Sequence, residues 1–174
     1  ITGNVLVTLT NNGAKANFHG SILKITEKTA DKLSLEFESE TFLAGGPESG
    51  FSCPDNMAFD RKGNLWITSD ISGGAMGQEP YTTFKNNGLF FVPMSGKDAG
   101  KVLQVASAPV HAEFTGPFFS PDGKTLFLSV QHPGEYSPSL DELASHWPEG
   151  GTSIPKPAVV GITGPALEAI TGAT

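Results

Sequence analysis

The sequence has little cysteine, no long apolar run and no cluster of basic residues. Cys53 is the one cysteine among 174 residues, so no disulfide can form within the chain. No stretch approaches the roughly 20 apolar residues that cross a bilayer, so no membrane-spanning helix is expected. The net charge is −7 and the 11 Lys and Arg residues are scattered, so nucleic-acid binding is not expected.

Glycine and proline, in contrast, are abundant, with 21 and 13 residues spread along the chain. This distribution indicates many tight turns between short elements rather than a low-complexity tract. The chain begins at Ile1 without a basic and apolar leader, so no signal peptide is expected within these residues. We therefore expect it to be a processed or trimmed part of a longer protein.

A repeat of 60 residues runs through the chain, because Gly3, Gly63 and Gly123 each precede a strand-like segment. These segments are rich in the Val, Ile, Leu, Phe and Trp residues that favour pleated sheets. A further short strand is predicted before each of the two later glycines, and others follow all three. Each unit therefore indicates four short antiparallel strands with turns between them.

Four strands per unit at this period are typical of the blades of a β-propeller. We expect an all-β partial propeller of about three four-stranded antiparallel blades. Residues 1–50 are predicted to form a blade without its first strand, 51–109 a full blade, and 110–163 a blade without its last strand. Residues 164–174 are predicted to form a tail, which either contains a short helix at 166–170 or is disordered. The alternative is a two-sheet β-sandwich, which the regular repeat disfavours.

Three blades do not close a propeller, which needs about four to eight. Two apolar blade faces would therefore stay uncovered within this chain. We expect the remaining blades of the parent chain, or another copy of this one, to cover them.

Oxygen-bearing side chains stand where the second and third predicted blades begin. Asp55 and Asn56 follow Pro54, and Glu113 lies among small and apolar residues. Carboxylate and amide oxygens are the donors that Ca²⁺ requires. The alternatives are an Asx turn at Asp55 and Asn56, and a solvated edge charge at Glu113.

A second polar group follows the predicted strands, at the turn Gln-His-Pro-Gly-Glu of residues 131–135. There His132 could bind a metal or donate a proton, or it could simply cap the loop. Asn11 and Asn12 lie at the same phase two repeats earlier, where they line the same rim or form a simple turn. Asp70 lies one residue before this phase in the middle blade.

Six motifs follow one another along the chain: Gly-Asn-Val-Leu-Val-Thr-Leu-Thr-Asn-Asn at 3–12, Cys-Pro-Asp-Asn-Met-Ala-Phe-Asp at 53–60, Gly-Asn-Leu-Trp-Ile at 63–67, Glu-Phe-Thr-Gly-Pro at 113–117, Ser-Val-Gln-His-Pro-Gly-Glu at 129–135 and Ser-His-Trp-Pro at 145–148. In this order and spacing they resemble the C-terminal part of the PhoX-type alkaline phosphatases, up to about Thr163.

This resemblance implies a six-bladed propeller, exported by the twin-arginine route to the periplasm or beyond. It implies hydrolysis of phosphate monoesters at alkaline pH by a centre that contains calcium and iron. Matched motif by motif, it implies metal binding by Asp55, Asn56 and Glu113, and an active-site rim formed by Asn11, Asn12, Gln131, His132 and Glu135.

Two elements of that family have no counterpart in this sequence. One is a cysteine near the N-terminus that helps to hold iron, and Cys53 does not share its context. The other is an Arg-Pro-Glu-Asp segment that would precede Ile1. We therefore expect a fragment of a metal-dependent phosphomonoesterase, inactive alone and with its catalytic residues unassigned. The alternatives are a non-catalytic propeller module that binds proteins and a lactonase-like, calcium-dependent propeller hydrolase.

Overall fold

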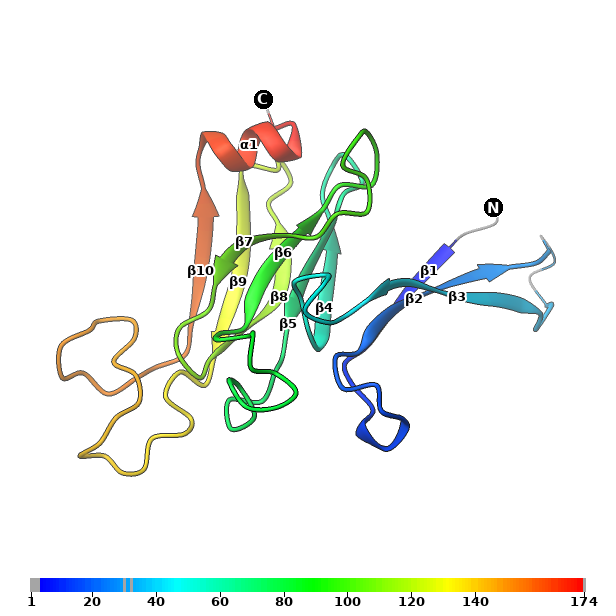
Figure 1. Ribbon diagram of the computed structural model, residues 1–174. Helices are drawn as coiled ribbons and strands as arrows, with labels where there is room; N and C mark the ends of the chain where they lie inside the picture. The colour runs from blue at the N-terminus through cyan, green and yellow to red at the C-terminus, as the bar shows by residue number, and fades with distance from the viewer. Residues whose placement is uncertain (1–3, 30, 32, 174) are drawn as a thin grey trace.

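The computed structural model describes residues 4–29, 31 and 33–173, which form three antiparallel sheets and a short C-terminal helix (Figure 1). The first sheet contains β1 (Asn4–Leu9), β2 (Ser21–Glu27) and β3 (Phe37–Ala44). The middle sheet contains β4 (Pro54–Phe59), β5 (Leu65–Ser69), β6 (Gly88–Val92) and β7 (Leu103–Ser107). The third sheet contains β8 (Glu113–Phe119), β9 (Thr125–Gln131) and β10 (Ala158–Thr163). A 3₁₀ turn, η1 (Gly13–Lys15), precedes β2, and the helix is α1 (Pro165–Thr171).

Strands that follow one another in the chain pair within each sheet, and the three sheets do not close into a ring. The predicted all-β partial propeller is therefore confirmed, with three strands in each flanking sheet and four in the middle one. None of the described strands crosses residues 50–51 or 109–110, although the blade boundaries themselves stay a prediction. Thr2 and Gly3, the predicted start of the repeat, lie outside the described residues.

The turns at the repeated glycines have the geometry that their sequences predict. Gly63 and Gly123 have φ angles of +78° and +76°, a region that a side chain disfavours. The N–H of Gly63 donates to the carbonyl of Asp60 at 2.9 Å, and that of Gly123 donates to Ser120 at 2.8 Å. Each turn connects the first two strands of its sheet.

Strand β5 carries the core because both of its faces are buried. Leu65 and Ile67 pack toward the first sheet with Ile22, whereas Trp66 packs toward the third sheet with Leu126. All five side chains are fully buried. Burying each large apolar side chain stabilises a fold by about 1.5–3 kcal/mol, so β5 joins the three sheets into one body.

The flanking sheets, in contrast, leave large apolar side chains in solvent. On the first sheet Val5 and Phe37 are 55% and 58% exposed, and on the third Phe118 and Val159 are 65% and 70% exposed. Exposed apolar patches of this kind mark interaction surfaces.

Helix α1 confirms the short helix predicted at 166–170 and lies across the turn ends of two sheets (Figure 1). The Thr171 hydroxyl donates to the carbonyl of Gly123 at 3.1 Å, and the Lys62 Nζ donates to the carbonyl of Ala169 at 3.0 Å. The helix therefore fastens the middle and third sheets together. Among the described helices, none has the length and apolar character needed to cross a membrane.

Candidate functional site

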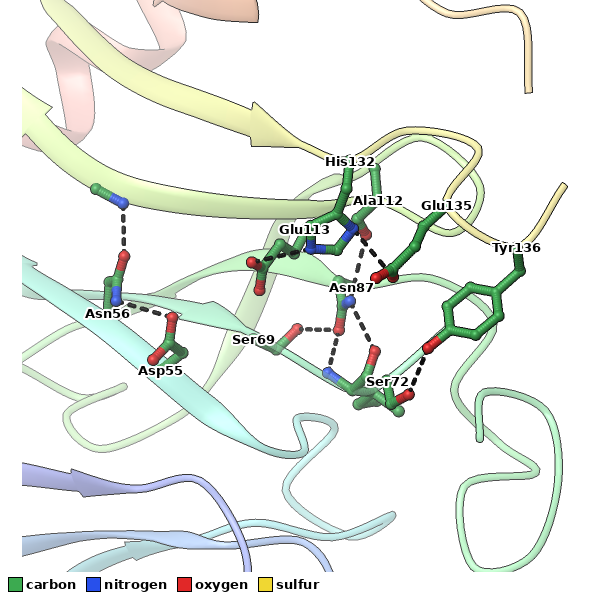
Figure 2. A network of polar contacts seen from close by, with 12 residues as sticks. Asp55, Asn56, Ser69, Ser72, Asn87, Ala112, Glu113, His132, Glu135 and Tyr136 are labelled. Atoms are coloured by element: carbon green, nitrogen blue, oxygen red, sulfur yellow. Dashed lines mark hydrogen bonds and ion pairs between the residues drawn. The ribbon is translucent and has the colours of Figure 1, made fainter. Parts of the chain in front are cut away.

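Polar side chains from the middle and third sheets meet where β5 and β9 end and β8 begins (Figure 2). Glu113 is the first residue of β8, and its Oε1 lies 3.3 Å from Nε2 of His132. On the other side of the ring, His132 Nδ1 lies 3.3 Å from Oε2 of Glu135. Asp70 directly follows β5, and its charge acts on Glu113. We call these four residues, Asp70, Glu113, His132 and Glu135, the carboxylate cluster.

Glu113 is the buried centre of this cluster. It is 6% exposed, and its Oε2 has no hydrogen-bond partner. Burial, followed by the negative charge of Asp70, raises the pKa of Glu113 to about 7, although His132 acts in the opposite direction. A buried carboxylate oxygen without a partner beside a second carboxylate is an arrangement that a cation would stabilise.

Asp55 and Asn56 form a separate pair on β4. Asn56 Nδ2 donates to Asp55 Oδ2 at 2.8 Å, and Asn56 Oδ1 accepts from the Gly116 N–H at 2.6 Å. The pair therefore links the middle sheet to β8. Burial, and then the charge of Asp70, raises the pKa of Asp55. The charge of Asp70 thus acts on both Asp55 and Glu113. These two residues are the carboxylates that the sequence analysis predicts as metal ligands.

The other predicted rim residues lie elsewhere in the contact network. The side chain of Asn12 caps the η1 turn, and Asn11 Nδ2 donates to the sulfur of Cys53 at 3.7 Å. Gln131 pairs directly with Glu113 in the β8–β9 register, but its side chain is exposed. The structure therefore brings Glu113, His132 and Glu135 together, whereas the rim roles of the asparagines and Gln131 stay predictions.

The loop that carries His132 is fastened to the loop after Asp70 by Tyr136. The Tyr136 hydroxyl lies 3.0 Å from the Ser72 hydroxyl. A Cβ atom on Gly73 would lie only 2.7 Å from the Tyr136 ring, so the ring packs directly on the backbone there. Sequence reasoning missed Tyr136 as a functional residue, because nothing in the sequence pairs it with a glycine 63 positions earlier.

Comparisons with known proteins identify the family to which the chain belongs. The sequence matches the family described as alkaline phosphatase PhoX over residues 2–134. The chain belongs to the PhoX alkaline phosphatase family. The predicted resemblance is therefore confirmed.

Among solved structures, this PhoX-family chain is similar to Pseudomonas fluorescens PhoX, described in complex with vanadate, a transition state analogue. The identity is 28%, the TM-score is 0.74, and the match covers 92% of this chain. It covers 31% of the Pseudomonas chain, so the sequence spans about a third of that protein's length. The comparison with curated proteins gave no significant match.

The donors around Glu113 in this PhoX-family chain are mainly carboxylate oxygens. Within the described part of the chain, no group of three or more His, Cys, Asp and Glu side chains forms a metal site by itself. The unpaired oxygen of Glu113 and the carboxylates of Asp70 and Asp55 are hard donors of the kind that Ca²⁺ takes, often with water and further ligands.

Cys53 does not fit an iron ligand in this structure. It is 1% exposed, with a φ of +51°, and lies in a small cluster with Tyr81 and Phe84. Its sulfur accepts from the Ser52 hydroxyl at 3.5 Å and donates to the Phe18 carbonyl at 3.6 Å. The thiol therefore occupies a structural position between the first and middle sheets.

Proposed function

We propose that this chain forms one wall of the active site of a metal-dependent phosphomonoesterase. The observation that supports this best is the buried, unpartnered Oε2 of Glu113 beside Asp70, in a member of the PhoX phosphatase family. The substrate class is a phosphate monoester, in keeping with a solved relative described with a transition state analogue.

In this proposal Glu113 and Asp70 hold calcium together, with Asp55 as a neighbouring oxygen donor. Asn56 orients Asp55 through their 2.8 Å hydrogen bond. When bound, calcium would neutralise charge on the phosphoryl oxygens of the ester. Without a cation, the Glu113 carboxyl keeps a proton up to about pH 7, the value to which its pKa is raised.

His132 serves the same site from its solvent side. Its side chain is 38% exposed, and each ring nitrogen lies 3.3 Å from a carboxylate oxygen, of Glu113 or of Glu135. A ring that carries both protons therefore has an acceptor at each nitrogen. We propose that His132 donates a hydrogen bond beside the ester.

The wider setting of the site is also part of the proposal. PhoX phosphatases are metalloenzymes, and we expect iron beside calcium, with iron held by residues other than Cys53. We infer that further blades or another copy cover the exposed faces around Val5 and Val159, and that the protein works in the periplasm or outside the cell. On this basis the isolated chain is inactive.

The test is a pair of phosphatase assays with p-nitrophenyl phosphate. The purified 174-residue chain should show no turnover, with or without CaCl₂. A chimera in which this chain replaces the aligned third of Pseudomonas fluorescens PhoX should hydrolyse the ester. In that chimera Glu113→Gln should lower the turnover by about 100-fold or more, whereas Glu149→Gln, at an exposed glutamate that pairs with Lys156, should not.

Three results would count against the proposal. Robust turnover by the isolated chain would show that it is not a dependent part. A folded chimera that hydrolyses lactones but not phosphate esters would favour the lactonase alternative. A folded chimera that binds no Ca²⁺ and keeps full activity with Glu113→Gln would remove the metal role of Glu113.

A further inference from the structure

Asn87 is a buried asparagine that the proposed active site does not yet include. It immediately precedes β6 in the middle sheet and is 2% exposed. Its side chain reaches the residues on either side of Asp70 and the residue before Glu113 (Figure 2). It therefore touches the backbone at both carboxylates without contacting either carboxylate.

Every hydrogen-bonding position of the Asn87 amide is used. Oδ1 accepts from the Ile71 N–H at 2.7 Å and from the Ser69 hydroxyl at 3.2 Å. Nδ2 donates to the carbonyl of Ile71 at 3.0 Å and to that of Ala112 at 3.2 Å. An asparagine side chain has two acceptor positions and two donor protons, so this set satisfies it completely. Turning the amide over would set Nδ2 against the Ile71 N–H, so its orientation is fixed.

The backbone around Asn87 strengthens the same connection. The Asn87 carbonyl accepts from the Ala108 N–H at 2.8 Å, in the turn that leads to β8. The N–H of Gly88 donates to the Ser69 hydroxyl at 2.9 Å. One residue thus joins the end of β5, the start of β6 and the segment that delivers Glu113.

We propose that Asn87 is the positioning residue for the Asp70–Glu113 pair, and that it holds these two carboxylates from neighbouring blades close enough to share one cation. This inference rests on the proposed function, in which that pair binds calcium. Asparagine suits the position because an aspartate could not donate to the two carbonyls. An aspartate would also add a negative charge beside two existing ones.

The test compares two buried asparagines of the middle sheet. Asn87→Ala and Asn87→Ser are the test variants, and Asn64→Ala is the matched control. Asn64 is 8% exposed and bonds Asp60 and the Met94 N–H, but it lies at the opposite end of β5 from Asp70. In calorimetric titrations with CaCl₂, both Asn87 variants should bind Ca²⁺ about tenfold or more weakly, as outer partners of metal ligands do. Asn64→Ala should stay within about twofold of the unaltered chain, because its site is separate.

A second readout needs no metal. In ¹³C spectra of the metal-free chain, the side-chain carboxyl signal of Glu113, assigned with Glu113→Gln, should move in the Asn87 variants and stay in place in Asn64→Ala. If the Asn87 variants do not fold, Ser69→Ala, which removes one of the four side-chain bonds to Asn87, gives the decision by the same readout.

The outcomes separate the two proposals. An unmoved Glu113 signal in folded Asn87 variants, or an equal loss of Ca²⁺ affinity in Asn64→Ala, overturns the positioning role. If neither the unaltered chain nor the chimera with Pseudomonas fluorescens PhoX binds Ca²⁺, the calcium part of the proposed function fails. In that event the Glu113 signal alone still supports or overturns the role of Asn87.

Discussion

Asp60 and Glu113 are two carboxylates with the same burial and opposite surroundings. Both are 6% exposed. Asp60 accepts hydrogen bonds from the backbone of Lys62 and Asn64 at 2.9 and 3.0 Å, and from Trp66 Nε1 at 3.1 Å. Glu113 has a single partner, His132, and its second oxygen has none.

This difference in hydrogen bonding indicates that Asp60 has a structural role and that Glu113 belongs to a functional site. A satisfied buried carboxylate fixes its neighbours, so Asp60 holds the turn at Gly63 and the indole of Trp66 in place. An unsatisfied one lowers stability, and proteins keep such groups where function requires them. The Asp60 turn is therefore structural, and the carboxylate cluster is the candidate for chemistry.

Removing Asp60 should have the largest effect on stability. Asp60→Ala leaves the buried donors of Asn64 and Trp66 without acceptors, so we expect a loss of about 3–5 kcal/mol in the free energy of unfolding. Urea denaturation measures it. Asp122→Ala, at the exposed turn of the next repeat, is the control and should cause a much smaller loss. Equal losses at the two turns would contradict a special role for Asp60.

Calcium should stabilise the chain through Glu113 and not through Asp60. If Glu113 binds Ca²⁺, a concentration about 100-fold above the Kd should stabilise the chain by about 2.7 kcal/mol. Glu113→Gln should remove most of that gain, which thermal denaturation with CaCl₂ or with EDTA would measure. The control is Glu149→Gln, which should keep the full gain. A Glu113→Gln protein that Ca²⁺ stabilises as before would rule out Glu113 as a ligand.

The dependence of stability on pH should carry the signature of Glu113. Its pKa in the folded chain, about 7, lies above the ordinary value of 4.5, so folding favours the protonated form. The stability that this provides is complete below about pH 4.5 and is lost as the pH rises through about 7, by roughly 2 kcal/mol. The loss is smaller than the full pKa shift implies, because solvent reaches the His132 side of the cluster.

The measurement for this dependence is urea denaturation of the metal-free chain across that range. Glu113→Gln has no titrating group at this position and should give a flatter profile than the unaltered chain. Parallel profiles for the two proteins would show that Glu113 does not titrate in the expected range.

The sequence predicts the strands well because their determinants are local. Turn glycines such as Gly63 and residues such as Trp66 set φ angles and pleated packing within a few positions of themselves. The contact between Glu113 and His132 follows from strand pairing, since β8 and β9 are neighbours in the chain. Most of the fold, and this half of the site, could therefore be read from the sequence.

The rest of the site depends on contacts between blades, which no local pattern encodes. Asp70 and Asn87 gain their roles from how the middle and third sheets are set against each other. The side chain of Asn12 caps a local turn, and its place on the rim stays a prediction. The repeat predicts the equivalent position of a residue in each blade, but it does not predict the direction in which the side chain points.

The smallest predicted effect on stability concerns the contact between the Tyr136 ring and the backbone at Gly73, beside the carboxylate cluster. Gly73→Ala would place a Cβ atom 2.7 Å from the Tyr136 ring, at a φ that alanine tolerates, so overpacking alone should destabilise the chain by about 1 kcal/mol. Gly13→Ala is the control, because its new Cβ atom would lie 3.7 Å from the Phe18 ring, in ordinary van der Waals contact. In NMR spectra Gly73→Ala should shift the ring signals of His132, whereas the indole N–H signal of Trp66 should stay in place. If both signals move equally, the loop that carries Tyr136 and the turn at Asp60 respond as one unit. That result would contradict the distinction between a structural Asp60 turn and a separate carboxylate cluster.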